Sequence, residues 1–326
     1  MVNIDKLGLD RTDRKIITEL DRNCRIPSTI LAKKVKKSRQ AVEYRINKLV
    51  KNGIITSFNA ALNPSKMGYK IYNLYFKLRN LPAEKQKLLR NLKSSRIVYW
   101  MGECSGKWDL MFGIFAKTDR SFFDFKNGLI SEFNDLIVEK EMQIMLSTAQ
   151  YPKMYFTNEI SAPTEFGGEI VDNKIDALDN RILYNLVNNG RISLVDLTSK
   201  TNSTISIVQS RLRKLEKTSI IIQYRIGINL DRLGLEFYKA IIEFDRYTKE
   251  DENRILGYVS GLPNTQYFIR KLWAIELELV VSNFQEYYKI IEDLKMKFPE
   301  VIKSVDSVLM ITDEWTPGFK TLYKPE

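Results

Sequence analysis

The sequence predicts an α+β protein that contains two tandem copies of the same two units, a helical unit and a mixed helix–strand unit. Three observations support this prediction. The two halves of the chain align without a gap after a shift of 166 residues. Each half begins with apolar residues at helical spacing. Each half then changes to a pattern in which strands and helices alternate.

The internal repeat keeps one register over about sixty positions, which chance does not produce. Asp10 matches Asp176 at the start of the repeat, and the matches continue through both helical units. Other matched pairs are Leu20 and Leu186, Leu31 and Leu197, Val42 and Val208, Arg45 and Arg211, and Leu49 and Leu215. We therefore interpret the chain as the product of an internal duplication.

Each copy starts with a helix-forming segment that an aspartate is placed to cap. Asp10 and Asp176 precede apolar residues at helical spacing, and each is followed by a second acid three positions later. After two further helical segments, residues 54–60 are rich in β-forming side chains. Three helices with a small β-ribbon predict a winged helix over residues 1–68 and again over residues 174–234.

Between Arg25 and Asn52 the chain predicts two short helices separated by a tight turn. The turn lies at Lys36 and Lys37, and the second helix begins at Ser38. Its apolar positions share one helix face and are Val42, Ile46 and Leu49. The opposite face is polar and cationic. This pattern is typical of a helix-turn-helix that reads DNA.

The positive charge of the chain is concentrated in the two helical units. The whole chain has a formal net charge of +11. Residues 1–68 contain 15 Lys and Arg against 6 Asp and Glu, and residues 167–234 contain 10 against 7. The rest of the chain is close to neutral. A localised basic patch indicates a polyanionic partner.

Composition argues against several other kinds of site. The chain has no histidine, which is the commonest general acid–base group and metal ligand. Cys24 and Cys104 lie far apart and predict neither a disulfide framework nor a zinc site. No apolar run approaches the ~20 residues of a membrane helix, and the N-terminus lacks the apolar region of a signal peptide. We therefore expect a cytoplasmic protein without a metal or cofactor.

The second unit of each copy reads as strand, helix, strand, strand, helix and strand. This βαββαβ order predicts a ferredoxin-like fold over residues 69–150 and over residues 235–315. Residues 151–173 contain prolines and glycines without a sustained period and predict a linker. Residues 316–326 are predicted to form a C-terminal tail.

Together these residues resemble the Lrp/AsnC family, the leucine-responsive or feast/famine transcription regulators. The matching positions are Leu9-Asp10-x-x-Asp13-x-x-Ile16, Arg25-Ile26, Leu31-Ala32 and Ser38-x-x-x-Val42-x-x-Arg45-Ile46-x-x-Leu49-x-x-x-Gly53-Ile54-Ile55. The resemblance implies a winged helix-turn-helix that binds DNA, followed by a βαββαβ module that senses a ligand and mediates dimerisation. Members of the family usually carry one copy, whereas this chain carries two.

The resemblance and the helix-turn-helix pattern predict the residues that contact double-stranded DNA. In the first copy these are Lys36, Lys37, Ser38, Arg39, Gln40, Glu43, Tyr44, Arg45 and Lys48. In the second copy they are Thr204, Ser206, Gln209, Ser210, Arg211 and Lys214. The second set carries fewer charges, so we expect the second copy to bind DNA more weakly.

Some of these side chains have an alternative structural role. Ser38 and Thr204 are placed to cap their helices, to contact a phosphate, or to do both. Arg45 and Arg211 are expected on the phosphate backbone, as the resemblance implies, with a salt bridge to the first helix as the alternative. For the outward-facing side chains of the recognition helix as a group, the alternative role is an ordinary solvated helix surface.

A second candidate site lies between the middle strands of the first βαββαβ unit. The family carries a Gly…Asp element there, near the interface that binds an effector, and Gly102, Ser105, Gly106 and Asp109 resemble it. This implies a small amino-acid-type effector, and the alternative is a plain glycine-containing hairpin turn. The corresponding stretch of the second copy, residues 270–276, has no glycine.

The function predicted from these features is sequence-specific DNA binding in transcription regulation. One alternative is an architectural DNA-binding protein of low specificity. Another is a tetrapyrrole (siroheme-type) decarboxylase, because some haem-pathway decarboxylases share this architecture in paired copies. The resemblance implies histidine among their working groups, and this chain has none.

Duplication also has a geometric consequence. We predict that the two βαββαβ units pack against each other within the chain as a pseudo-dimer, so that the two heads read unlike half-sites. The alternative is a homodimer that pairs like with like, and homo-oligomers are expected in either case.

Overall fold

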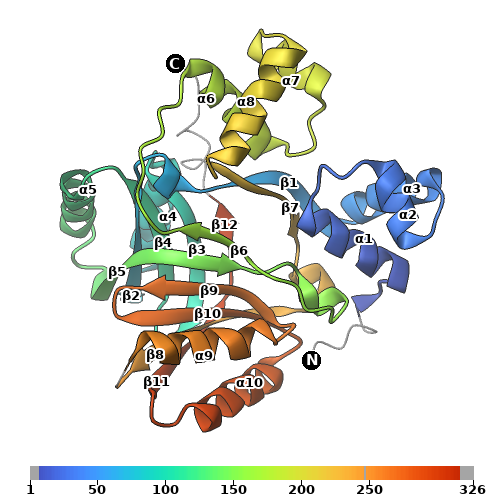
Figure 1. Cartoon of the computed structure of the whole chain (residues 1–326). Helices are drawn as coiled ribbons and strands as arrows, with labels where there is room; N and C mark the ends of the chain where they lie inside the picture. Colours follow the sequence, from blue (N-terminus) through green and yellow to red (C-terminus); the bar gives the residue numbers. More distant parts are fainter. Residues whose placement is uncertain (1–6, 246, 316–326) are drawn as a thin grey trace.

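The computed structural model describes residues 7–245 and 247–315 and contains both copies of the predicted repeat (Figure 1). Each copy supplies a three-helix head and a βαββαβ unit. The two heads lie apart from each other beside a layer of long strands (Figure 1). Among the described residues, no helix is both long enough and apolar enough to cross a membrane. The predicted C-terminal tail lies outside the described residues.

The helices of the two heads occur where helical spacing predicts them. In the first head they are α1 (Arg11–Arg22), α2 (Ser28–Val35) and α3 (Arg39–Lys51), and in the second α6 (Ala177–Asn188), α7 (Leu194–Thr201) and α8 (Ile205–Lys217). Asp10 caps α1 by accepting a hydrogen bond from the Asp13 backbone N–H at 2.8 Å. Asp176 caps α6 in the same way at 2.9 Å. These caps satisfy N–H groups that the helices leave without intrahelical partners.

The β-ribbon differs from the one expected for a self-contained winged helix. Each copy contributes a single strand, β1 (Ile55–Leu62) and β7 (Ile221–Ile228), and these two strands pair antiparallel in a sheet of their own. Helix α1 of the first copy packs on β7, and α6 of the second copy packs on β1. A strand needs a partner to satisfy its backbone groups, and here the other copy provides it. The ribbon therefore joins the two heads (Figure 1).

The strands of the two βαββαβ units form one large sheet. The first unit contributes β2 (Lys70–Leu78), β3 (Val98–Gly106), β4 (Leu110–Ala116) and β5 (Ile137–Gln150), and the second contributes β8 (Glu236–Phe244), β9 (Thr265–Lys271), β10 (Ala274–Val281) and β11 (Ile302–Met310). The spatial order is β5-β2-β4-β3 in the first unit and β11-β8-β10-β9 in the second, which is the same arrangement. A short strand, β6 (Thr164–Gly167), pairs with β5, and another, β12 (Glu314–Trp315), pairs with β3.

The two units join at both of their edges. Strand β5 pairs with β9, and β11 pairs with β3, so the eight long strands close into a ring. The two seams are equivalent under the repeat, because each joins the last strand of one unit to the second strand of the other. The predicted pseudo-dimer is thus formed within one chain, and closure leaves neither unit with the free edge that invites pairing with other molecules.

Helices cover the outer faces of this ring. They are α4 (Pro82–Ser94) and α5 (Asp119–Glu132) in the first unit, and α9 (Lys249–Ser260) and α10 (Phe284–Lys297) in the second. Apolar side chains between helices and strands form a separate core in each unit, and a further cluster continues through the ring interior to the first head. Cys24 and Cys104 are buried in that further cluster as free thiols.

The segment predicted as a linker connects the copies but is not a solvated chain. Tyr151, Met154, Tyr155 and Phe156 are almost completely buried, and a short 3-10 helix, Met154–Phe156, packs on α1. Prolines and glycines in this segment suggested a loose connection, but its aromatic side chains anchor it to the core. The segment therefore helps to fix the first head relative to the strands.

Close packing at the seam between β3 and β11 requires a glycine. Gly106 has φ of +123°, and a Cβ added there would lie 2.4 Å from the Ser307 carbonyl oxygen. We predict that Gly106→Ala lowers the free energy of unfolding by about 1–3 kcal/mol, because it strains the backbone and pushes the strands apart. Urea denaturation measures this loss.

Gly128→Ala is the matched control for this change. Gly128 lies on the exposed side of α5, where an added Cβ has no neighbour within 4 Å. It should leave stability unchanged or raise it by up to about 1 kcal/mol, because alanine favours the helix. Equal effects of the two substitutions would contradict the role given to Gly106.

Candidate nucleic-acid interface

The turn between the second and third helix of each head has the same backbone geometry in both copies. Lys36 and its counterpart Asn202 both adopt the left-handed conformation, with φ of +54° and +49°. A non-glycine residue rarely adopts this region, but a turn between two short helices requires it. The turn places Lys36 and Lys37 at the surface directly before α3.

The residues that precede the recognition helices act as caps. The Ser38 hydroxyl accepts a hydrogen bond from the Ala41 N–H at 3.2 Å, and the Thr204 hydroxyl accepts one from the Ile207 N–H at 3.4 Å. The structural role proposed for both residues is therefore present. Both side chains are also exposed, so capping leaves them accessible at the N-terminus of the helix.

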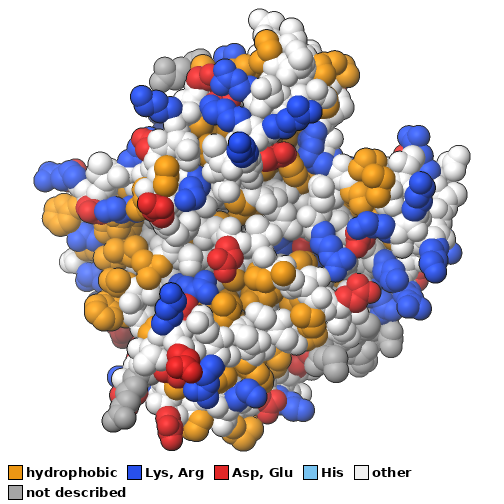
Figure 2. All heavy atoms as spheres, in the orientation of Figure 1, with side chains coloured by type: hydrophobic (Ala, Val, Ile, Leu, Met, Phe, Trp, Pro, Cys, Tyr) orange, Lys and Arg blue, Asp and Glu red, His pale blue; other side chains and the backbone are white. Residues whose placement is uncertain are grey.

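The outward face of α3 is exposed and mostly cationic or polar. Arg39, Gln40, Tyr44 and Lys48 all lie at the surface, and the side chain of Tyr44 is 69% exposed. The Arg39 Nε donates to Glu43 Oε1 at 2.8 Å, a pair one helical turn apart. That hydrogen bond holds the pKa of Glu43 below its usual value. Figure 2 shows Lys and Arg side chains gathered over this head, at the right of the view.

Arg45 and Arg211, which correspond under the repeat, each form an ion pair with the first helix of their head. Arg45 Nη1 donates to Asp10 Oδ2 at 2.6 Å and to Asp13 Oδ1 at 2.7 Å. The arginine therefore ties α3 to the N-terminus of α1, where two carboxylates favour the helix dipole. This contact is the salt bridge to the first helix that was given as the alternative role of the arginine.

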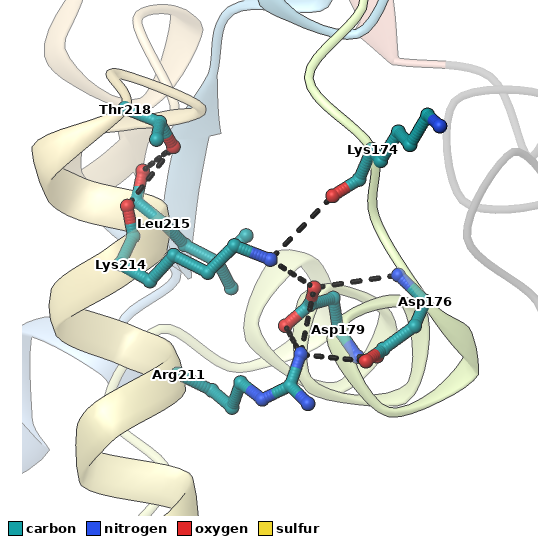
Figure 3. Close-up of polar contacts among 7 residues, drawn as sticks. All are labelled: Lys174, Asp176, Asp179, Arg211, Lys214, Leu215 and Thr218. Carbon is teal, nitrogen blue, oxygen red and sulfur yellow. Dashed lines mark hydrogen bonds and ion pairs between the residues drawn. The ribbon is translucent and has the colours of Figure 1, made fainter.

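Arg211 repeats this arrangement in the second head (Figure 3). Its Nη1 donates to Asp176 Oδ2 at 2.6 Å and to Asp179 Oδ2 at 3.2 Å. Lys214 Nζ reaches the same Asp179 oxygen at 3.0 Å, and Asp179 is fully buried. Lys214, which the sequence predicts on DNA, also belongs to this ion cluster.

The outward face of α8 is much less polar than that of α3. Ser206 and Ser210 are exposed, and Gln209 is half-buried. Ile205 and Ile207 are 47% and 45% exposed on the same helix. Sequence reasoning missed Arg213, which is exposed on α8 but falls outside the motif positions. Helical spacing places it on the outward face, because it lies three residues after Ser210 and four after Gln209.

The candidate effector residues lie at the seam between the two copies. Ser105 and Gly106 pair with β11, and a Cβ at Gly102 would lie 2.3 Å from the Met310 side chain. Asp109 accepts hydrogen bonds from Lys77 Nζ at 3.0 Å and from the Leu78 N–H at 2.8 Å. These contacts match the hairpin-turn alternative. The glycines allow the strands to approach, and the carboxylate anchors the turn.

The ion pairs of Arg45 should matter for stability. We predict that Arg45→Met lowers the free energy of unfolding by about 1–3 kcal/mol, because two hydrogen bonds between charged groups are lost from a partly buried site. Arg39→Met is the matched control, since its pair with Glu43 is exposed and spans one helical turn, and it should cost at most about 0.5 kcal/mol. Equal losses in urea denaturation would contradict this ranking.

The stabilisation by Arg45 should also depend on pH. Burial opposes ionisation of Asp10, but hydrogen bonds from the Asp13 N–H and from Arg45 hold the pKa of Asp10 below its usual value. The contribution is therefore present above the unfolded pKa of about 4 and is lost as the pH falls through the lower folded value. The stability difference between wild type and Arg45→Met should narrow in acid, as measured by urea denaturation at a series of pH values.

Comparison with known proteins agrees with this geometry. A family model described as winged helix-turn-helix DNA-binding matches residues 9–56 and 175–222, which are the two heads up to the start of the ribbon strands. The model matches twice, at positions that correspond under the repeat.

Several curated relatives match one copy of the repeat. The proline dehydrogenase transcriptional activator of Rhodobacter capsulatus is 30% identical over 162 residues, which are 48% of this chain and 97% of that protein. The HTH-type transcriptional regulator Ptr1 of Methanocaldococcus jannaschii is 31% identical over 31% of this chain and 68% of that protein. LrpC of Bacillus subtilis is 28% identical over 42% of this chain and 92% of that protein.

A solved structure shares the duplicated fold over nearly the whole chain. The siroheme decarboxylase NirDL covers 96% of this chain and 97% of its own, with a TM-score of 0.65 and 10% sequence identity. At this identity the likeness shows the fold alone. The sequence matches to single-copy regulators, together with the two family-model matches, show that this chain belongs to the Lrp/AsnC family of helix-turn-helix transcription regulators.

Proposed function

We propose that this protein binds double-stranded DNA through its two heads and regulates transcription in the cytoplasm. Family membership supports the class of function, and the exposed face of α3 carries the proposal for this chain. In the described part of the chain, Lys36, Lys37, Gln40 and Lys48 enter no ion pair or side-chain hydrogen bond, so they remain available to a ligand. Lysine suits phosphate contact, and glutamine suits the edge of adenine.

The first head supplies most of the affinity in this proposal. Its segment carries a net charge of +9 against +3 for the second segment. Arginine at position 39 pairs well with guanine in the major groove, whereas Ile205 occupies the corresponding position of the second head. Apolar side chains such as Ile205 and Ile207 suit contact with thymine methyl groups. The two heads would therefore prefer different sequences.

Closure of the two units within one chain determines the kind of DNA site. Single-copy relatives place identical heads on a two-fold axis, which favours a palindrome. In this chain the ribbon and the strand ring hold two unlike heads in one molecule. We therefore propose a site with two unlike halves, spaced by the ribbon. Self-association of whole chains and control by a small amino-acid-type effector belong to the same proposal.

The proposal assigns no catalytic role to the chain. Winged-helix and βαββαβ units in this arrangement occur in both regulators and a siroheme decarboxylase, so the fold does not discriminate between them. The relatives at about 30% identity are regulators, which favours regulation. Titration with siroheme under anaerobic conditions should leave the absorbance of the tetrapyrrole unchanged. Its decarboxylation by the chain would refute this part of the proposal.

Binding to DNA can be tested through the charges of the first head. We predict that Lys37→Gln weakens binding to all duplexes and reduces the slope of log K against log salt by about 0.9, because one phosphate contact is lost. Arg39→Ala should cost about 1–3 kcal/mol on the selected duplex and less on random duplex, because it removes a base contact. Fluorescence anisotropy over a salt series measures both.

Lys289→Gln is the matched control for lost charge. Lys289 is exposed on α10, which belongs to neither head, and Lys289→Gln should not change the affinity for DNA. Equal loss in this control would show a diffuse charge effect and contradict the proposed interface. Selection from random duplexes should yield two unlike half-sites, and a strict palindrome would contradict the proposed geometry.

A further inference from the structure

The strand ring encloses a cavity whose wall carries one unusual lysine. An eight-stranded barrel is wide enough either to be filled by side chains or to hold one small ligand. Part of this ring is filled, for example by Tyr75 and Met111. Between the ring and the β1–β7 ribbon lies a cavity of about 420 Å³, lined by both strands of the ribbon and by several strands of the ring. This volume lies within the range of small-molecule sites.

Three lysines are buried in the described part of the chain, and two of them have matched carboxylates. These two are Lys239 and Lys271 in the ring. Lys239 Nζ lies 2.9 Å from Glu276 Oε1 and 2.5 Å from Glu278 Oε1. Lys271 Nζ also contacts Glu276. Two cations therefore face two carboxylates, which is the pairing that buried charges require.

The third buried lysine, Lys153, shares one carboxylate with an arginine. Arg225 donates from Nε and Nη2 to the two oxygens of Asp21, at 3.1 and 2.8 Å. Lys153 Nζ lies at a longer distance, 3.4 Å, from Asp21 Oδ1. Burial lowers the pKa of Lys153 to about 8, with Arg225 adding to the shift and Asp21 opposing it. A lysine that is desolvated beside another cation is the kind that reacts with carbonyl groups.

Lys153 lies on the cavity wall beside polar atoms that lack partners. In the described part of the chain, neither Asn73 Oδ1 nor the Tyr155 hydroxyl has a hydrogen-bond partner, and both residues line the cavity with Lys153. Both side chains are buried, at 4% and 1% exposure. Buried polar groups are nearly always paired in folded proteins, so these two indicate a polar ligand. The Tyr155 hydroxyl can donate to a carbonyl oxygen, and Asn73 Oδ1 can accept from a hydroxyl group.

Aromatic side chains form another part of the wall. Tyr99 stacks on Phe115 with ring centroids 4.0 Å apart and planes within 5°, and both residues line the cavity. Gly113 makes room for this stack, because a Cβ there would lie 2.4 Å from the Tyr99 ring. Such a surface suits an aromatic body.

The charges on the wall favour an uncharged ligand over an anionic one. Besides Lys153, the described wall has two cations, and both already face carboxylates. Arg225 is paired with Asp21, and Lys239 is paired with glutamates of β10. Asp313 also lines the cavity and adds a negative charge. A carboxylate on the ligand would therefore be desolvated near acidic groups without a free cation to compensate it.

We propose that Lys153 forms a reversible imine with a small uncharged aromatic aldehyde bound in this cavity. The deprotonated Nζ adds to the carbonyl carbon, and the C=O electron pair moves to the oxygen, which accepts a hydrogen bond from Tyr155. One N–H proton passes to that oxygen and gives a carbinolamine. The C–O bond then breaks, the second N–H proton leaves with the oxygen as water, and the C=N bond forms. Amine and aldehyde thus become imine and water, and no other reactant is needed.

Reductive trapping of the full-length protein with benzaldehyde and cyanoborohydride tests the site. The reagent converts each imine into a stable benzylamine, which peptide mass spectrometry locates. We expect one benzyl group per chain at Lys153, formed at least tenfold faster than at any exposed lysine. An exposed lysine, with a pKa of about 10.4, is roughly a hundredfold less deprotonated near neutral pH. Labelling of Lys153 that is no faster than labelling of exposed lysines would overturn the proposal.

Two further aldehydes test the class of ligand. The probe 4-formylbenzoate adds a carboxylate to the ring, and propanal lacks the ring. For each aldehyde, the rate at Lys153 is divided by the rate at exposed lysines, which removes differences in intrinsic reactivity. We expect this ratio to fall at least tenfold for both probes. Ratios equal to that of benzaldehyde would overturn the assignment of an uncharged aromatic body.

Two pairs of variants separate a reactive site from a structural role. Lys153→Arg should abolish the fast labelling, whereas Lys289→Arg, at an exposed lysine, should retain it. Tyr155→Phe should slow labelling of Lys153 at least tenfold and leave the Tm unchanged or raised, because the lost hydroxyl has no partner. Fast labelling that persists in both Lys153→Arg and Tyr155→Phe would overturn the proposal.

Tyr151→Phe is the matched control for Tyr155→Phe. The Tyr151 hydroxyl lies 2.6 Å from the Ser260 hydroxyl, and Tyr151 is not among the residues that line the cavity. This substitution should lower the Tm and leave labelling of Lys153 unchanged. Equal slowing in both tyrosine variants would assign the effect to stability and overturn the role given to Tyr155. DNA plays no part in these measurements, so the imine site and the proposed function stand or fall separately.

Discussion

Pairing of strands between the two copies is the constraint on which the rest of the structure depends. Strands β5 and β9 form one seam, β3 and β11 form the other, and together they close eight strands into a ring. A single βαββαβ unit would leave both of its edges open to other molecules. Because the partner edge belongs to the same chain, the ring forms without a second molecule. The positions of the ribbon, the heads and the cavity all follow from this closure.

The ribbon joins the two copies by a second set of contacts. Some of these contacts are repeated on both sides of the ribbon, and one is not. The Cys24 N–H donates to Tyr224 O at 2.9 Å, and its counterpart, the Gly190 N–H, donates to Phe58 O at 2.6 Å. The buried pair of Arg225 and Asp21 has no such counterpart, since Asn59 and Val187 occupy the equivalent positions. A buried ion pair contributes little net stability compared with apolar side chains of similar volume, but losing one partner leaves an unpaired buried charge. Duplication has thus allowed the two sides of the ribbon to diverge.

Divergence of the heads follows the same logic. Once both heads belong to one chain, a substitution in one is no longer imposed on the other, as it is in a symmetric dimer. The structural arginines, Arg45 and Arg211, keep the same contacts in both heads. The outward faces of α3 and α8 differ instead, in charge and in apolar exposure. Conservation of the internal contacts alongside change at the surface fits two heads with one fold and different sequence preference.

The sequence by itself determined the features that depend on short-range physics. Helical spacing located α3 and α8, Asp10 and Ser38 were found as caps, and the 166-residue repeat established duplication. The helices and their caps depend on contacts within a few residues, and the duplication is visible because the two halves of the sequence align. Only the tertiary structure decided that the ribbon is shared, that Arg45 binds carboxylates, that Gly106 serves a seam and that Asn73 faces a cavity. Those features depend on segments far apart in the chain, whose pairing leaves no local pattern in the sequence.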